Sequence, residues 1–496
     1  MKTTILSILC FFVSLSAFGQ KKILDHPDFE IWNTIQGQRI SRNGKLIIYS
    51  LEKGEADNHL KIKDGQGNLV FDHERGEGGQ FTFDSDYALF TIKAWKAAER
   101  EMKREKVKGE DMPKDTLAIF HPGKKSLVKI PHVRGYKMPA KWGGYVAYQL
   151  QAIDNGDDKK NSSKNGYHVV LRNLATGSQD TLKYITDYRF AEEGKTLAFI
   201  TTGDDARTPG VYIQELESGQ IQQVFSSPKG KYARMTMSKS GERLAFVADL
   251  DTTKALVRPN ALYSWNKGMS QAEKIVDENS APSGYLVSSD GNISFSEDES
   301  KLYFGLATPP VLQDTSLIDE EIVNVEVWTY DEPRLYTVQE LQVQNDKRKS
   351  YLTAIHLNEN NKLVQLASTE YPNASLGNEG NANLALINTS LPYQLQSQWE
   401  GGTYRDYALV NVATGEVKQA MKAIRGGVSF SPSAKYASGY SSADSTWFTY
   451  NVATGKRQDL TKGKVFYNEL NDSPNFPGSY GSAGWTENDE RFLIYD

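Results

Sequence analysis

The chain has 496 residues, of which 39% are hydrophobic and 11% aromatic, and it contains 40 glycines. This composition allows a large core of strands joined by turns, argues against extensive disorder, and is too long for one ordinary compact domain. The 57 basic and 62 acidic side chains leave a formal net charge of −5, so no single-sign field exists to attract nucleic acid or an anionic membrane.

The N-terminus has the three parts of an export signal. Lys2 supplies the positive start, and Ile5–Val13 form a short apolar stretch. Ala17 and Gly19, with Phe18 between them, form a small-x-small cleavage site. The apolar stretch is too short to span a membrane. We therefore expect residues 1–19 to be a signal peptide and the mature protein to be exported, either periplasmic or secreted.

The chain has a single cysteine, Cys10, which lies inside this apolar stretch. A lipid anchor would need a cysteine at the cleavage junction instead, so we do not expect one. Because the mature protein would carry no thiol, disulfides, thiolate catalysis and cysteine-ligated metals are excluded from the interpretation.

A phrase that combines a polar turn with alternating apolar residues recurs along the chain. Glycine or asparagine in the turn accepts the positive φ of a tight hairpin, so each copy predicts two antiparallel strands. The copies lie at Ser41–Tyr49, Phe190–Phe199, Ser238–Phe246, Phe295–Phe304, Phe430–Ala437 and Trp485–Tyr495.

A second phrase lies between copies of the first. It occurs at Asn173–Gly177, Asn411–Gly415 and Asn451–Gly455, and more weakly at Glu215–Gly219. Alternation of the two phrases implies a four-stranded unit of about 40–60 residues, the size of a propeller blade. We predict an all-β fold over residues 20–496, a β-propeller of about seven or eight four-stranded blades, incomplete at its C-terminal end. A β-sandwich array or a β-helix is the less favoured alternative.

Two segments break the repeat. Residues 93–114 mix acidic and basic side chains and predict a charged, solvated helical insertion that ends near Pro113. Residues 371–391 are rich in asparagine, glycine and serine and predict an irregular loop with one short strand at Leu384–Ile387.

No catalytic motif emerges from the residues. A Gly-x-Ser-x-Gly turn, which exposes the nucleophile of an α/β-hydrolase, does not occur, and the nearest fragments, Gly439–Ser441 and Gly481–Gly484, are interpreted as turn residues. Gly76–Gly79 does not form a phosphate-binding loop before a helix. The histidines show no metal-binding pair: His26, His59, His73, His121, His132, His168 and His356. We therefore predict no catalytic, cofactor-binding or metal-binding residue and no cofactor in this chain.

Three stretches give the chain a resemblance to a known family. They are the first hairpin at Ile40–Tyr49, the segment Met112–Leu117 that closes the charged insertion, and Val325–Leu335 with its Trp-Thr-Tyr-Asp-Glu-Pro-Arg order. In these stretches, and in their order over residues 20–496, the chain resembles the N-terminal propeller portion of prolyl oligopeptidase family serine peptidases, in particular exported forms from Bacteroidota-like bacteria.

The resemblance implies a substrate-gating role. In that family an α/β-hydrolase domain with a Ser, Asp and His triad follows the propeller, and the propeller admits short peptides and excludes folded proteins. Residues 20–496 contain no such domain, and the sequence stops at Asp496 within an apolar strand, so we hypothesise a fragment of a longer peptidase. The implied partners are that C-terminal domain and peptide substrates, with no nucleic acid and no membrane span, and no activity is expected from this chain alone.

The dipeptidyl peptidase branch of the family also holds the substrate amine with two glutamates on the propeller. The adjacent pairs here are Glu192 with Glu193, at a hairpin turn, and Glu320 with Glu321, which lack the aromatic-leading context of that motif. Neither pair is assigned the role, and the branch stays open.

Two other functions remain open. One is a stand-alone periplasmic binding propeller, like those of the Tol system, that recognises a protein or peptide. The weaker one is a propeller enzyme with its site in the central channel, such as a lyase or a glycosidase, although no spacing of carboxylates nominates a glycosidase pair.

Overall fold

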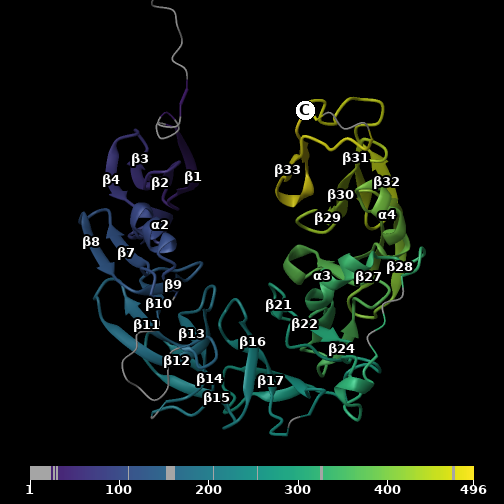
Figure 1. The fold of residues 1–496 in the computed structure, drawn as a ribbon, viewed down its shortest axis with the longest axis horizontal. Coiled ribbons are helices and arrows are strands. Elements are labelled where there is room, and N and C mark those ends of the chain that lie inside the picture. Colours follow the sequence, from purple (N-terminus) through teal and green to yellow (C-terminus); the bar gives the residue numbers. More distant parts are fainter. Residues whose placement is uncertain are drawn as a thin grey trace, which may run out of the picture. The chain divides into compact units, whose positions relative to one another are not determined.

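The computed structural model describes residues 24–25, 28, 32–109, 111–151, 162–204, 206–253, 255–323, 325, 328–471 and 475–496 (Figure 1). The predicted signal peptide, Cys10 and His26 lie outside these residues. The chain divides into two compact units, Met1–Asn155 with His168–Thr181, and Gly156–Tyr167 with Leu182–Asp496. We call them unit 1 and unit 2 and describe each by itself.

Unit 1 consists of antiparallel sheets in which each strand pairs with the next along the chain. The first two sheets have four strands each: β1 (Asn33–Ile40), β2 (Leu46–Lys53), β3 (His59–Asp64) and β4 (Leu69–Glu74), then β5 (Gly76–Phe81), β6 (Ala88–Ile92), β7 (Thr116–His121) and β8 (Ser126–Ile130). The third sheet contains β9 (Val133–Lys137), β10 (Tyr145–Leu150), β11 (Tyr167–Asn173) and the first residues of β12 (Gln179–Phe190).

Unit 2 repeats the same pattern. The rest of β12 heads a sheet with β13 (Thr196–Thr201), β14 (Gly210–Glu215) and β15 (Ile221–Ser226), and the next sheet contains β16 (Lys231–Met237), β17 (Arg243–Asp249), β18 (Asn260–Asn266) and β19 (Glu273–Val276). In the following sheet β20 (Leu286–Val287) and β21 (Ser294–Phe295) both pair with β22 (Lys301–Ala307), as two halves of one first strand, before β23 (Tyr351–His356) and β24 (Lys362–Gln365).

Two further four-stranded sheets and one hairpin end unit 2. They are β25 (Asn373–Leu376), β26 (Leu384–Thr389), β27 (Arg405–Asn411) and β28 (Val417–Ile424), then β29 (Val428–Phe430), β30 (Tyr436–Ser441), β31 (Thr446–Asn451) and β32 (Lys456–Asp459), and the hairpin of β33 (Ser482–Trp485) and β34 (Phe492–Ile494). The helices are few: α2 (Lys96–Arg104), α3 (Tyr336–Lys347), α4 (Gln394–Glu400) and the single turns η3 (Asp319–Glu321), η4 (Asn378–Gly380), η5 (Leu391–Tyr393) and η6 (Glu487–Asp489).

Central strands bury both of their faces, which requires each sheet to stack between two others. In β17, Phe246 packs in one apolar cluster with Val211 of β14, while the adjacent Val247 packs in another with Phe304 of β22. Successive side chains of a strand point to opposite faces, so this alternation means that the preceding sheet covers one face and the following sheet the other. The same alternation in β26 and β27 places one set of side chains against β22 and β23, and the other against β30 and β31.

The first repeated phrase joins the first and second strands of a sheet, and the second phrase joins the third and fourth. In Asn411–Gly415 the side-chain Oδ1 of Asn411 accepts hydrogen bonds from the amides of Ala413 and Thr414, at 2.8 and 3.1 Å. Gly415 has φ of 76°, a conformation that glycine adopts at little cost. The asparagine and the glycine therefore specify this turn locally.

Turns of the first phrase contact one another from sheet to sheet within unit 2. The amide of Glu193 donates to the carbonyl of Lys239 at 2.9 Å, and the amide and hydroxyl of Ser240 donate to the carboxylate of Glu299 at 2.7 and 2.9 Å. A similar contact reaches the β25–β26 turn, which is not a copy of the phrase: the amide of Glu297 donates to the carbonyl of Glu379 at 3.0 Å. The phrase thus makes a hairpin and also links that hairpin to its neighbour.

The prediction of an all-β chain built from four-stranded, propeller-type sheets is confirmed. The described residues contain eight such sheets when β12 is counted in both of its sheets, followed by the β33–β34 hairpin. The predicted irregular loop at 371–391 was wrong in part, because Asn373–Leu376 forms β25 and pairs with a β26 that extends to Thr389. Within the predicted insertion at 93–114 the structure has α2, whose side chains are all at least partly exposed.

Candidate functional site

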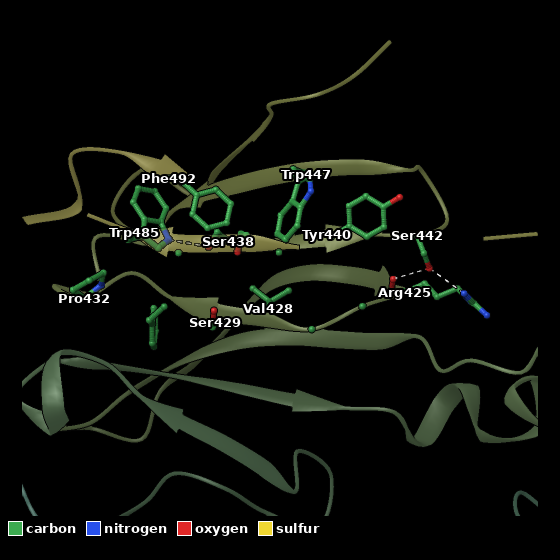
Figure 2. A pocket seen from close by; sticks show the side chains of 16 residues that line it. Arg425, Val428, Ser429, Pro432, Ser438, Tyr440, Ser442, Trp447, Trp485 and Phe492 are labelled. Atoms are coloured by element: carbon green, nitrogen blue, oxygen red, sulfur yellow. Dashed lines mark hydrogen bonds between the residues drawn. The ribbon is translucent and has the colours of Figure 1, made fainter. Parts of the chain in front are cut away.

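A pocket of about 790 Å³ lies in unit 2, between the β29–β32 sheet and the β33–β34 hairpin (Figure 2). Where two four-stranded sheets meet, side chains of both fill the interface. Here the second partner has only two strands, and the face of β30 and β31 is covered in part. The pocket has the size typical of sites for small molecules or short peptide segments.

One wall of the pocket is a row of aromatic rings. Trp485 lies 5.1 Å from Phe492, Phe492 lies 5.5 Å from Trp447, and Trp447 lies 5.4 Å from Tyr440, measured between ring centroids. Figure 2 shows these side chains along one side, opposite Val428 and Ser429 of β29. The indole Nε1 of Trp485 donates to Ser438 Oγ at 2.9 Å, which fixes this ring. Such a wall offers a large apolar surface with defined geometry.

Polar groups lie at the Arg425 end of the pocket. The guanidinium donates to Ser442 Oγ and to the carbonyl of Glu400, both at 3.0 Å, and lies 4.0 Å over the ring of Phe476. Two buried donors, Nε of Arg425 and Nε1 of Trp447, have no hydrogen-bond acceptor among the described residues. Both atoms are shielded from the pocket space, so the polar groups that a ligand could contact at this end are the hydroxyl of Ser442 and the exposed nitrogens of Arg425.

A buried carboxylate fixes the hairpin beneath the aromatic wall. Asp489 is 6% exposed, accepts a hydrogen bond from Ser431 Oγ at 2.7 Å and from the amide of Ser433 at 3.1 Å, and also accepts one from Ser433 Oγ. Burial alone would raise the pKa of Asp489, but these hydrogen bonds hold it below its ordinary value. The same turn-to-turn contact that links the other sheets therefore positions Trp485 and Phe492.

The described lining of the pocket is mostly apolar and neutral. Among the described residues Arg425 is the one charged side chain that lines it, and burial raises the pKa of the Tyr440 phenol, which stays neutral at physiological pH. Serine hydroxyls line it as well, and no histidine or carboxylate is found in the part of its lining that the structure describes. Its chemistry favours an apolar or aromatic group that also presents hydrogen-bond acceptors.

A second pocket, of about 470 Å³, lies in unit 1 beside Trp32 and Lys96. The Lys96 ammonium donates to the carbonyls of Lys53 and Ala56 and to Asn58 Oδ1, at 3.2, 2.8 and 2.9 Å. All three hydrogens of this ammonium group are used to hold α2 against the β2–β3 loop. Lys96 therefore has a structural role and has no hydrogen left to donate to a ligand.

Both fragments interpreted as turn residues lie instead in strands, which corrects that prediction. Gly439–Ser441 belongs to β30, and Ser482–Gly484 belongs to β33. A Cβ at position 439 would collide with the carbonyl oxygen of Gly427, so this glycine allows the close approach of β29 and β30. Several residues of both fragments line the pocket, a role that their sequence context did not reveal.

The glutamate pairs lie at separate structural positions. Glu193 forms an ion pair with Lys239 at 3.3 Å within the turn-to-turn contact described above. Glu321 accepts a hydrogen bond from the amide of Ile318 at 3.1 Å, at the start of η3. Both of these carboxylates make local structural contacts.

The described histidines are likewise dispersed. His59 contacts Asp72 at 3.0 Å, and the buried His356 contacts the carbonyl of Val412 at 2.9 Å. The described part of the chain contains no group of three or more histidine, cysteine, aspartate or glutamate residues arranged to hold a metal ion. Among those residues, no helix is both long and apolar enough to cross a membrane.

Comparisons with known proteins give likeness to solved structures alone. No protein-family description and no curated protein sequence matches the chain. The structure is similar to an oligogalacturonate lyase solved with manganese, at 10% identity and a TM-score of 0.33, with 71% of this chain and 84% of the lyase covered. It is similar to a prolyl endopeptidase, at 7% identity and a TM-score of 0.35, with 86% and 49% covered.

A third similar structure is the β-propeller domain of the trilobed protease from Pyrococcus furiosus, at 11% identity and a TM-score of 0.31, with 80% of this chain and 97% of that domain covered. The chain spans about half the length of the prolyl endopeptidase, 49%, and 45% of the tricorn protease. These likenesses span proteins of different activities and assign none to this chain.

Proposed function

We propose that the chain is the peptide-admitting propeller region of an exported serine peptidase of the prolyl oligopeptidase type. In this proposal the catalytic serine belongs to an α/β-hydrolase domain outside residues 20–496, residues 1–19 direct export, and the propeller itself hydrolyses nothing. Its role is to select extended peptides and to exclude folded proteins.

The aromatic pocket is the observation that carries the proposal. It combines an apolar wall, neutral hydroxyls and one cation, and this mixture suits the side chains and carbonyl groups of an extended peptide. The resemblance at Ile40–Tyr49, Met112–Leu117 and Val325–Leu335 and the series of four-stranded sheets are in keeping with this role.

Labelling with a fluorophosphonate tests the proposal. The probe is applied to the whole product of the gene, and the modified serine is located by mass spectrometry. We expect one reactive serine outside residues 20–496, in a Gly-x-Ser-x-Gly sequence. A reactive serine within residues 20–496 would refute the proposal.

A stand-alone binding propeller of the periplasm is the second candidate. The pocket favours it as well, because the pocket is built entirely from the propeller-type sheets and needs no other domain to recognise a peptide. The same labelling separates the two candidates, since a product without any reactive serine that still binds peptides would be the binding protein.

A further inference from the structure

The segment between β22 and β23, residues 308–350, projects apolar side chains into solvent. We call it the β22–β23 insert; it contains η3 and α3. Tyr330 is 96% exposed and Leu341 is 80% exposed, and Ile318, Val323 and Trp328 are also more than half exposed. Such a concentration of large exposed apolar side chains marks an interaction surface on a soluble protein.

The insert is held in place by specific contacts. Arg334 forms an ion pair with Asp346 at 2.7 Å, which closes the loop onto α3, and the rings of Trp328 and Tyr336 lie 5.1 Å apart. Gln339 Nε2 donates to Glu332 Oε1 and to the carbonyl of Arg334, both at 2.9 Å. These contacts give the exposed surface a defined shape.

The surface continues onto α4. Gln398 Nε2 donates to the carbonyls of Glu332 and Pro333, at 3.2 and 2.9 Å, and the adjacent Trp399 is 82% exposed. Glu400, at the end of the same helix, accepts the hydrogen bond from Arg425 of the pocket described above. The insert is therefore in contact with α4, and α4 in turn is in contact with the pocket.

Residues 308–333 of the insert carry charge of one sign, whereas Arg334, Lys347, Arg348 and Lys349 follow in its second half. Residues 308–333 contain no lysine or arginine, and the described carboxylates among them are Asp314, Asp319, Glu320, Glu321, Asp331 and Glu332. All six are exposed, and among the described residues none of them forms an ion pair. The charge therefore remains available to an incoming group of opposite sign.

We propose that the β22–β23 insert and α4 dock a protein segment that carries lysine or arginine beside large apolar side chains. The apolar side chains would cover Trp328, Tyr330 and Trp399, while the cations would pair with the six described carboxylates named above. Electrostatic complementarity of this kind speeds association and sets its specificity. Anionic membranes and nucleic acids would be repelled by the same carboxylates.

Calorimetric titration of the full chain tests this surface with an amphipathic leucine–lysine peptide as the probe. We expect saturable binding that weakens as salt is raised. A leucine–glutamate peptide of the same length should not bind. Equal binding of the two peptides would overturn the proposal.

Charge reversal at the insert should weaken binding of the leucine–lysine peptide about tenfold in the double variant Glu320→Lys/Glu321→Lys. The matched control, Glu278→Lys/Glu416→Lys, changes the net charge equally at two exposed acids outside the insert and should leave binding within about twofold of wild type. Equal weakening in both double variants would show attraction to the net charge alone and overturn the proposal.

The apolar contribution is tested with Tyr330→Ser, which alters a side chain that lies almost entirely in solvent and should not affect folding. We expect weaker binding of the leucine–lysine peptide, and unchanged binding would contradict the proposal. None of these outcomes depends on the location of a reactive serine, so this docking surface and the proposed peptidase role succeed or fail separately.

Discussion

At the scale of single residues, Asp489 shows how one side chain ties two hairpins together. It lies in the turn of the β33–β34 hairpin and accepts hydrogen bonds from Ser431 and Ser433 in the preceding sheet. We expect Asp489→Asn to lower the free energy of unfolding by about 1–3 kcal/mol, because hydrogen bonds to a buried charge are lost. Urea unfolding measures this change. Glu487→Gln, at an exposed acid of the same turn, is the control and should be neutral.

Asp298 makes stability depend on pH in a definite direction. Burial alone would raise its pKa, but hydrogen bonds from Ser296 and Ser300 lower the pKa of Asp298 to about 2. Since its pKa is higher in the unfolded chain, this contribution is complete above about pH 4 and is lost as pH falls toward 2. The stability difference between wild type and Asp298→Asn should shrink over that range. A difference that grows on acidification would show that the carboxylate is not stabilised by folding.

At the scale of elements, the central strands are where burial on both faces stabilises the stack. Phe246 of β17 is fully buried, and its ring stacks on that of Tyr263 at 5.5 Å. We expect Phe246→Ala to lower the free energy of unfolding by about 3–5 kcal/mol, because it leaves a cavity between two sheets. Val417→Ala, at a half-exposed position of β28, should cost far less. Comparable costs in denaturant unfolding would contradict the proposed stacking.

Sequence patterns predicted those elements whose signals are local. The turns at Asn173–Gly177 and Asn411–Gly415 follow from asparagine acceptors and positive-φ glycines, and the flanking strands follow from alternating apolar residues. Strand β25 was missed because Asn373–Leu376 has only four residues, two of them polar, and its pairing depends on β26. A local pattern cannot report a pairing of that kind.

The pocket was missed for the same physical reason at longer range. Tyr440 pairs with Trp447 across two strands of one sheet and Trp485 pairs with Phe492 across the following hairpin, and only stacking of hairpin on sheet brings Phe492 against Trp447. The contact between turns that Asp489 makes was not predicted either. The turn itself was predicted, because it lies in the Trp485–Tyr495 copy of the first phrase. Which side chains of two neighbouring sheets meet depends on how the folded sheets stack, and a local sequence pattern does not contain that information.

At the scale of the whole molecule, the sheets supply binding surfaces rather than reacting groups in the proposed function. The aromatic pocket and the acidic, apolar β22–β23 insert are joined through α4, and the two surfaces differ in charge. Among the described residues the pocket has Arg425 as its single charged lining residue, whereas residues 308–333 of the insert carry carboxylates and no lysine or arginine. They are therefore suited to different partners.

The most direct test of the central claim is an assay of the purified chain with fluorogenic peptides, combined with the intrinsic fluorescence of its tryptophans. We expect a saturable fluorescence change as peptide binds beside Trp447 and Trp485, with no release of the fluorogenic group. Peptide turnover that persists through repeated purification would contradict the account, because it would place a catalytic centre within this polypeptide.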